Sequence, residues 1–302
     1  MRHADDTAPA AVDVCVCTFR RPSLRRTLES LARQDGAPTF RVIVADNDDI
    51  ASAEVLVNEA RAATGLAIHY VHAPARNISI ARNACLEAAR APLIAFIDDD
   101  EIAPPGWLAQ LAAALGRDGA DVVFGPVKAE YEAGAPSWAV KGDFHSFAPA
   151  VRADGQIDTG YSSNVMFRRA AAGAARFDPA LGRSGGEDTV FFAQLHTRGA
   201  RPGFAPHAVV YEPTAAARVS MTWLTRRAFR SGQSHARVLR QRGQGALTIA
   251  APATAKALYC ALATLLTVWS PVLMRRNLLR GALHVGVVAK ALGAAEPALY
   301  GG

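Results

Sequence analysis

The sequence predicts an α/β fold in which helices cover both faces of a mostly parallel sheet. Between residues 12 and 212, apolar runs of strand length alternate with segments whose apolar residues recur at helical spacing. Strands that alternate with helices are joined by right-handed crossovers, which place the strands parallel in one sheet. Several of these runs end in polar or acidic residues, so we expect polar side chains to gather at one edge of the sheet.

The expected elements follow one another in order along this part of the chain. Strands are expected at residues 12–18, 41–46, 66–72, 92–97, 121–125 and 206–212. Helices are expected at residues 52–63 and 79–90, around Leu24, Leu28 and Leu31, around Trp107 and Leu115, and after Asp188. Residues 128–159 are less regular, and there we expect loops that lie over the edge of the sheet.

The composition excludes several classes of protein. Half of the 302 residues are hydrophobic, which excludes a disordered or fibrous chain. The four cysteines are scattered without a C-x-x-C pair, which argues against a disulfide framework or a zinc site and favours a reducing cytosol. Residues 1–10 have no apolar core, so we expect no signal peptide, and we expect residues 1–11 to be disordered.

Charge divides the chain into two parts. Residues 1–212 carry 21 basic and 26 acidic residues, whereas residues 213–302 carry 12 basic residues and a single acid, Glu296. We therefore expect an α/β domain at residues 12–217 and a basic helical tail at residues 218–302. Such a tail is suited to an anionic surface, either lipid or nucleic acid. Lipid is favoured over nucleic acid because no recognised nucleic-acid-binding motif accompanies the charge.

An acidic cluster follows the apolar run at residues 92–97. The four acids at residues 98–101 emerge together at the end of this strand. Ligands bind where the strands of an open α/β sheet end, and Asp98 and Asp100, spaced D-x-D, can hold one hard divalent cation. The alternative is a helix N-terminal cap, because Pro104 begins a helix. Capping accounts for one or two of these acids and not for all four.

The turn after the first strand argues against one class of enzyme. Residues 17–23 lack the G-x-G-x-x-G pattern that lets a backbone approach a pyrophosphate closely. An enzyme that uses a nicotinamide cofactor is therefore disfavoured. The acidic cluster, with a metal ion, is the natural place for a phosphate to bind.

Five short pieces of the sequence stand in register with the expected strands and helices. In chain order they are residues 14–21, 42–47, 81–83, 96–100 and 186–188. Each piece is weak alone, but together they resemble family 2 glycosyltransferases of the GT-A fold over residues 12–212. The sequence departs from the family at Phe19-Arg20, where the family more often has tyrosine and asparagine.

The resemblance implies a nucleotide-sugar donor and gives several residues a role in binding it. Thr18 and Asp46, at strand ends, would contact the nucleotide base, and Asp98 would lie by the ribose. Arg82 would contact the base or the phosphates, because a guanidinium group binds phosphate bidentately. The alternatives are an Asx-turn at Asp46 and a solvated helix arginine at Arg82. Residues 159–164 would line the donor-sugar pocket or form a plain turn before a strand.

The resemblance also implies a metal ion and a catalytic base. Asp100 would bind Mg²⁺ or Mn²⁺, with Asp99 as the second candidate, and the metal would stabilise the diphosphate leaving group. Asp188 would act as the general base that removes the proton of the acceptor hydroxyl, with Glu187 in reserve. The alternative is that both carboxylates only cap the helix that follows them.

The activity expected from this resemblance is that of an inverting, metal-dependent hexosyltransferase. It would move a hexose from a nucleotide diphosphate donor, expected to be UDP-linked, to a lipid-linked saccharide in exopolysaccharide or cell-surface glycan synthesis. One alternative is a degenerate scaffold or membrane-binding protein, against which the intact Asp98, Asp100 and Asp188 argue. The other is a sugar nucleotidyltransferase, which would need a glycine-rich basic loop after the first strand.

The tail is expected to hold the protein at the cytoplasmic face of the bacterial inner membrane. Two basic stripes at helical spacing consist of Arg226, Arg230, Arg237 and Arg240, and of Arg276, Arg280 and His284. Between them, residues 257–274 run for 18 residues without a charge, which is borderline for a spanning helix of about 20 residues. The stripes favour a peripheral position in the headgroup layer. The alternative is a helical subdomain packed on the catalytic core.

Overall fold

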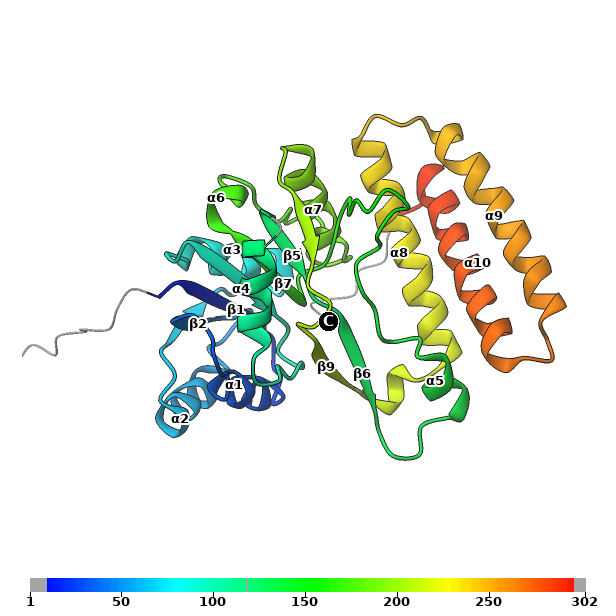
Figure 1. Cartoon of the computed structure of the whole chain (residues 1–302). Coiled ribbons are helices and arrows are strands. Elements are labelled where there is room, and N and C mark those ends of the chain that lie inside the picture. Colours follow the sequence, from blue (N-terminus) through cyan, green and yellow to red (C-terminus); the bar gives the residue numbers. More distant parts are fainter. Residues whose placement is uncertain (1–9, 118, 296–302) are drawn as a thin grey trace, which may run out of the picture.

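The computed structural model describes residues 10–117 and 119–295, which form an α/β unit followed by three long helices (Figure 1). Most of the segment expected to be disordered, residues 1–11, lies outside the described residues. The predicted α/β fold with a mostly parallel sheet and a C-terminal helical region is confirmed.

A seven-stranded sheet with the order β3-β2-β1-β4-β7-β5-β8 forms the centre of the α/β unit. Neighbouring strands are parallel except at β7, which runs antiparallel to both β4 and β5. The strands are β1 (Val12–Thr18), β2 (Phe40–Asp46), β3 (Ile68–His72), β4 (Leu93–Ile97), β5 (Val122–Phe124), β7 (Asn164–Arg168) and β8 (Pro202–Phe204). The strand order reverses between β1 and β4, so the loops after these two strands diverge and leave a crevice for a ligand.

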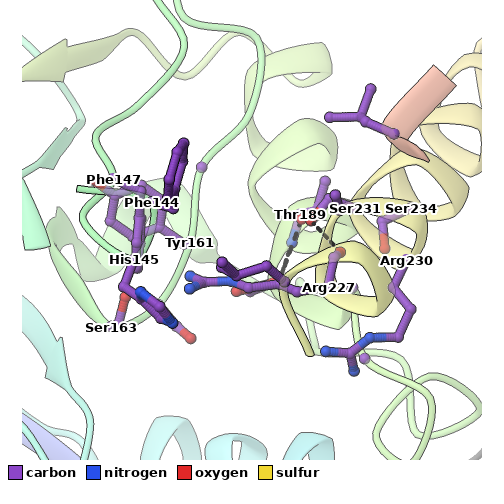
Figure 2. Close-up of a pocket in the computed structure, with 18 of the residues that line it drawn as sticks. Phe144, His145, Phe147, Tyr161, Ser163, Thr189, Arg227, Arg230, Ser231 and Ser234 are labelled. Carbon is purple, nitrogen blue, oxygen red and sulfur yellow. Dashed lines mark hydrogen bonds between the residues drawn. The ribbon is translucent and has the colours of Figure 1, made fainter. Parts of the chain in front are cut away.

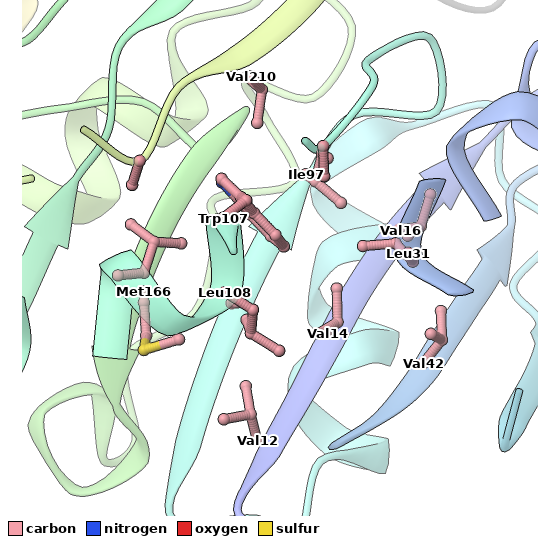
Figure 3. Close-up of a cluster of buried hydrophobic side chains, with 14 of the residues drawn as sticks. Val12, Val14, Val16, Leu31, Val42, Ile97, Trp107, Leu108, Met166 and Val210 are labelled. Atoms are coloured by element: carbon pink, nitrogen blue, oxygen red, sulfur yellow. The ribbon is translucent and has the colours of Figure 1, made fainter. Parts of the chain in front are cut away.

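Helices cover both faces of this sheet because side chains alternate along each strand. Val12, Val14 and Val16 of β1 are completely buried on one face, and Cys15 is completely buried on the other. The first face packs against α1 (Leu24–Ala32), α2 (Glu54–Thr64) and α4 (Trp107–Arg117). The second face packs against α3 (Ile78–Ala88), α6 (Arg169–Ala172) and α7 (Glu187–Thr197). Figure 3 shows the first of these two cores.

The irregular region contains more structure than the sequence predicts. Residues 128–159 were expected to form loops, but they contain most of β6 (Val127–Tyr131) and a short helix, α5 (Ser137–Gly142). The strand expected at residues 206–212 begins only at Val210, as β9 (Val210–Thr214). β9 pairs in parallel with β6 in a separate two-stranded sheet, and this pairing carries Glu212 to the carboxyl end of β4.

The C-terminal helices form a layer beside the α/β unit. They are α8 (Met221–Gln241), α9 (Ala246–Leu266) and α10 (Pro271–Ala291). Figure 1 shows α10 between α8 and α9, with α8 nearest the sheet. α8 and α10 cross closely at two glycines, because a Cβ at Gly232 would lie 1.9 Å from the carbonyl oxygen of Leu283. A Cβ at Gly286 would lie equally close, 1.9 Å, to the carbonyl oxygen of Phe229.

The uncharged run at residues 257–274, which is borderline in length for a spanning helix, is divided between two helices. α9 ends at Leu266, and α10 begins at Pro271 after Ser270, whose Oγ accepts a hydrogen bond from the N–H of Leu273 at 3.5 Å. Proline is favoured at the first position of a helix, which fixes the break there. Among the described residues, α9 is the one helix long and apolar enough to cross a membrane.

Candidate active site

The acids after β4 lie beside the end of β1, but each carboxylate has different contacts. Asp99 is buried, and its Oδ2 accepts a hydrogen bond of 2.7 Å from the hydroxyl of Thr18. Burial raises the pKa of Asp99 to about 7, although Thr18 and Arg21 act in the opposite direction. Asp99 therefore links β4 to β1, in the place where the sequence suggested a second metal ligand.

Asp100 is held by two arginines. Arg21 Nη1 lies 2.5 Å from Asp100 Oδ2, and Arg218 Nη2 lies 3.5 Å from the same oxygen. Arg218 comes from a short 3₁₀ turn, Ala216–Arg218, and its Nη1 also lies 2.7 Å from Glu212 Oε1. Sequence reasoning placed Glu212 in a late strand without a role and did not name Arg218, because only the pairing of β6 with β9 brings them here.

Asp98 borders a cavity and faces Arg82. The Oδ1 of Asp98 lies 3.8 Å from Arg82 Nη2. Desolvation by the surrounding protein raises the pKa of Asp98 to about 7. Repulsion from Asp100 and Asp99 adds to this shift, and the positive charge of Arg82 partly offsets it. The backbone N–H of Asp98 donates to the Oε2 of the buried Glu101 at 2.9 Å, which fixes the turn after β4.

The carboxylate groups present fit a hard divalent cation. Within the described residues, no group of three or more His, Cys, Asp or Glu side chains forms a ready-made metal site. Asp98 and Asp100 nevertheless offer oxygen donors, which Mg²⁺ and Mn²⁺ prefer. A cation bound by one or two carboxylates takes its other ligands from water and from substrate phosphates.

Asp46 is completely buried and makes three hydrogen bonds within the protein. Its Oδ1 accepts from the N–H of Asp48 at 3.1 Å, and its Oδ2 accepts from the N–H of Ala53 and the hydroxyl of Tyr70, both at 2.8 Å. This is the Asx-turn geometry that the sequence left open as an alternative. The contact that we expect between Asp46 and a nucleotide base stays a prediction.

Arg82 of α3 joins two of the predicted pieces. It is 7% exposed, forms an ion pair with Glu187 at the start of α7, and lies over the ring of Phe177 at 5.6 Å. Burial would lower the pKa of Arg82, but Glu187 and Asp98 outweigh burial and raise it, so the guanidinium stays charged. Glu187 is therefore neutralised by Arg82, and Arg82 is not the solvated helix arginine of the alternative interpretation.

Asp188 is placed differently from its neighbour Glu187. Its Oδ1 accepts a hydrogen bond of 2.6 Å from the N–H of Thr189, and the residue lines the cavity. Gly186 precedes the helix with φ of +84°, a conformation that favours glycine, and a Cβ there would lie 2.2 Å from Ser234 Oγ of α8. The glycines of this loop thus allow α8 to approach it closely.

The cavity has a volume of about 630 Å³ and lies between the α/β unit and the C-terminal helices (Figure 2). Asp98, Glu187 and Asp188 line it, and so do residues 160–163, which form the turn that precedes β7. Sequence reasoning assigned no role to the lining residues Phe144, His145, Phe147 and Arg227, and it placed Arg230, Arg276 and Arg280 on the basic stripes of the tail. Only tertiary packing brings these residues together.

Comparisons with known proteins agree with this architecture. The family model described as "Glycosyl transferase family 2" matches residues 13–174. The chain belongs to glycosyl transferase family 2. This glycosyltransferase is 46% identical over 297 residues to "Succinoglycan biosynthesis protein ExoM" of Rhizobium meliloti (strain 1021), and the match covers 96% of each chain.

Solved structures with low sequence identity share the fold of this family 2 glycosyltransferase. The mannosyltransferase PcManGT from Pyrobaculum calidifontis, in complex with GDP-Man and Mn²⁺, is 18% identical with a TM-score of 0.62, covering 92% of this chain and 88% of that one. Residues 1–349 of S. aureus TarS, in complex with UDP-GlcNAc, are 16% identical with a TM-score of 0.54, covering 94% and 92%. The expected GT-A fold is thereby confirmed.

Proposed function

We propose that this glycosyltransferase moves a hexose, with inversion, from a UDP-linked donor to a saccharide acceptor. The observation that carries the proposal is the cavity, which has the carboxylates of Asp98 and Asp188 on its wall. Asp188 accepts the proton of the acceptor hydroxyl while the hydroxyl oxygen attacks the anomeric carbon. The bond from that carbon to the diphosphate breaks, and the nucleotide diphosphate leaves with the bonding electrons.

Asp188 suits the role of base better than Glu187. Glu187 is 4% exposed and paired with Arg82, so accepting a proton would break a buried ion pair. Asp188 opens on the cavity from the first turn of α7, and its Oδ2 is not used in the hydrogen bonds to Thr189. Arg82 contacts both Glu187 and Asp98, so its role is to position these two carboxylates.

The donor's diphosphate is proposed to lie over the acids after β4. Asp100, together with Asp98, would hold Mg²⁺ or Mn²⁺ there, and Asp99 instead keeps β4 against Thr18. Such a metal, when bound, neutralises the charge that develops on the leaving diphosphate. Arg21 and Arg218 contact Asp100 and would place positive charge beside the leaving diphosphate. The PcManGT complex with GDP-Man and Mn²⁺ supports a metal in this fold.

The acceptor is proposed to be a lipid-linked saccharide in exopolysaccharide synthesis. The support is the similarity to ExoM, whose name places it in succinoglycan biosynthesis, and the character of the tail. Large apolar side chains on and after α9 are exposed, with Leu262 at 56%, Leu265 at 69% and Trp269 at 75%. Exposed apolar surface on a basic tail suits a membrane interface, so the enzyme would act at the cytoplasmic face of the inner membrane.

A screen of donors tests the proposal directly. Purified enzyme is incubated with UDP-, GDP- and dTDP-hexoses, with and without Mn²⁺ or Mg²⁺, and release of the nucleoside diphosphate is measured. We expect metal-dependent release from a UDP-hexose. Folded protein that turns over none of these donors would instead support the degenerate scaffold, and release of inorganic pyrophosphate from a nucleoside triphosphate and sugar phosphate would support the nucleotidyltransferase.

A further inference from the structure

A buried histidine lies on the wall of the cavity, in a place that the sequence does not connect with the site (Figure 2). His145 is 2% exposed and lines the cavity between the α/β unit and the C-terminal helices. It follows α5, which ends at Gly142, in a segment where the sequence predicts loops. Its ring contacts both β6 and α8, so it connects the two parts of the chain that form the cavity.

Both ring nitrogens of His145 have a hydrogen-bond partner. Nε2 lies 3.1 Å from the carbonyl oxygen of Arg218, and Nδ1 lies 3.1 Å from the hydroxyl oxygen of Tyr131. A carbonyl oxygen only accepts, so Nε2 carries the proton and donates it, while Nδ1 accepts from the Tyr131 hydroxyl. Burial lowers the pKa of His145, and the charges of Arg227 and Arg218 lower it further, although the hydrogen bond to the Arg218 carbonyl acts in the opposite direction. The imidazole is therefore neutral near pH 7.

Two aromatic rings hold the imidazole in this orientation. It stacks on Trp223 of α8, with ring centroids 5.4 Å apart and an angle of 23° between the ring planes. It meets Tyr131 of β6 edge-on, at 5.4 Å and 80°. The backbone N–H of His145 also donates to the Tyr131 hydroxyl at 3.4 Å. Packing of this kind restricts the ring to few rotamers, so Nε2 points at one acceptor.

The carbonyl group of Arg218 is the point where His145 meets the segment between β9 and α8. Its oxygen accepts from Nε2 of His145 and from the N–H of Ser220 at 2.9 Å, so both of its lone pairs are used. Ser220 is the N-cap of α8, and its Oγ accepts from the N–H of Trp223 at 3.2 Å. His145 and the start of α8 thus fix the backbone of Arg218 from two sides.

The side chain of Arg218 leads from this fixed backbone to the acids after β4. Its Nη1 lies 2.7 Å from Glu212 Oε1, and its Nη2 lies 3.5 Å from Asp100 Oδ2. The side chain is 29% exposed, so a ligand over Asp100 can reach it. A guanidinium group whose backbone and one N–H are already held loses less conformational entropy when it binds a phosphate.

We propose that His145 is a positioning residue, which holds Arg218 in place to bind the β-phosphate of the nucleotide diphosphate donor. Arg218 contacts the phosphate, because a guanidinium group suits phosphate oxygens, and His145 acts only through the Arg218 backbone. Loss of the Nε2 donor frees the turn at Arg218, so binding of the β-phosphate weakens while binding of the base and ribose does not. The inference rests on the proposed function, because it names residues that recognise the same donor.

The preference for UDP over UMP tests this role, because the two nucleotides differ by the β-phosphate. Both affinities are measured by calorimetry on the full chain in the presence of Mn²⁺. We expect His145→Phe, which keeps a ring against Trp223 but has no N–H, to reduce the preference for UDP about tenfold. His145→Gln should keep the preference within about threefold of the wild type, because its amide can donate to the Arg218 carbonyl.

A double-mutant cycle separates positioning from a general loss of structure. Arg218→Ala should reduce the preference for UDP at least as much as His145→Phe, and the double variant His145→Phe/Arg218→Ala should be no worse than Arg218→Ala alone. Leu111→Ala is the control for lost stability, because Leu111 is completely buried on α4 and does not line the cavity. It should lower the thermal midpoint but keep the wild-type preference.

The possible outcomes are distinct. An unchanged preference for UDP in His145→Phe would overturn the positioning role, and so would single-variant effects that add in the double variant. If His145→Phe does not fold, the smaller His145→Leu is measured in its place with the same expectation. A wild-type protein that binds UDP no more tightly than UMP would instead contradict the proposed function, because a diphosphate donor would then have no site for its β-phosphate.

Discussion

Two adjacent carboxylates at the start of α7 differ in what their oxygens contact. Glu187 pairs with the buried Arg82, while Asp188 faces the cavity. Burial raises the pKa of Glu187 above its ordinary value, although Arg82 acts in the opposite direction. The ion pair of these two buried side chains connects α3 to α7. The sequence placed both acids at a helix N-terminus but ranked them only through the family resemblance. Their division of roles depends on Arg82, 105 residues away in the sequence.

Asp100 tests the proposed metal. Asp100→Asn keeps the shape of the side chain and removes the charge that would hold the cation, so we expect turnover to fall by roughly 100-fold or more. EDTA should abolish wild-type turnover, and Mn²⁺ or Mg²⁺ should restore it. The variant Asp154→Asn, on an exposed loop, serves as the control and should keep wild-type turnover. Full activity of the wild type in EDTA would show that the acids serve another purpose.

The ionisation of the Asp13 carboxyl group makes the stability of the fold depend on pH. Burial alone would raise its pKa, but the hydrogen bond from Arg41 and the N–H groups of Ala91 and Arg90 outweigh burial and leave the pKa below its ordinary value. The charged form therefore stabilises the fold above the unfolded pKa of about 3.9, and this contribution is lost as the pH falls through the folded value. We expect the difference in unfolding free energy between wild type and Asp13→Asn to be largest near neutral pH and to shrink below about pH 4. A difference that grows at low pH would contradict this assignment.

At the scale of elements, the sequence predicts the sheet well and the connections less well. β1 is predicted to the residue, because an apolar run that only Asp13 interrupts ends in the polar turn at Thr18. β6 and α5 are missed, because short elements in a glycine-rich segment show no clear period. The break between α9 and α10 falls inside the uncharged run, at Ser270-Pro271, which is a typical helix start.

The crossing of α8 and α10 depends on the absence of side chains at two positions. A Cβ at Gly232 would meet the backbone oxygen of Leu283 at 1.9 Å, and a backbone atom cannot rotate away. We expect Gly232→Ala to lower the free energy of unfolding by about 1–3 kcal/mol, as overpacking does. Gly281→Ala is the matched control on α10, because its nearest contact, the Cβ of Cys260, lies at 3.4 Å. Urea unfolding of both variants measures the effect, and equal stability would show that the helices do not cross closely here.

At the scale of the whole molecule, two arginines of the basic tail lie on the cavity, whereas its large apolar side chains lie on the outer surface. Arg276 and Arg280 face the cavity, whereas Leu262, Leu265 and Trp269 are exposed to the outside. The sequence shows that the tail is basic and apolar, but it cannot show that these arginines and Asp188 share one cavity. That arrangement follows from the packing of α8 on the loop at Gly186.

The exposed apolar residues test membrane association. We expect the wild type to bind anionic vesicles at low salt. The triple variant Leu262→Ser/Leu265→Ser/Trp269→Ser should bind at least tenfold more weakly, because full burial of a large apolar side chain contributes about 1.5–3 kcal/mol and serine removes this contribution. Ile50→Ser/Val55→Ser, at 68% and 69% exposure near α2, is the control and should bind like the wild type. Co-sedimentation with the vesicles measures both. A wild-type protein that ignores anionic vesicles at low salt would contradict the membrane assignment.

The most direct test of the account is the transfer rate of Asp188→Asn at saturating donor and acceptor. An amide at this position cannot take the proton of the acceptor hydroxyl, and loss of a general base costs about 10²–10⁴-fold in rate. Donor affinity, measured in parallel by UDP binding, should stay at the wild-type value because the proposed role of Asp188 is on the acceptor and not on the nucleotide. We predict a transfer rate reduced by this factor with unchanged UDP affinity. Wild-type transfer with weakened UDP binding would contradict it and place Asp188 on the donor.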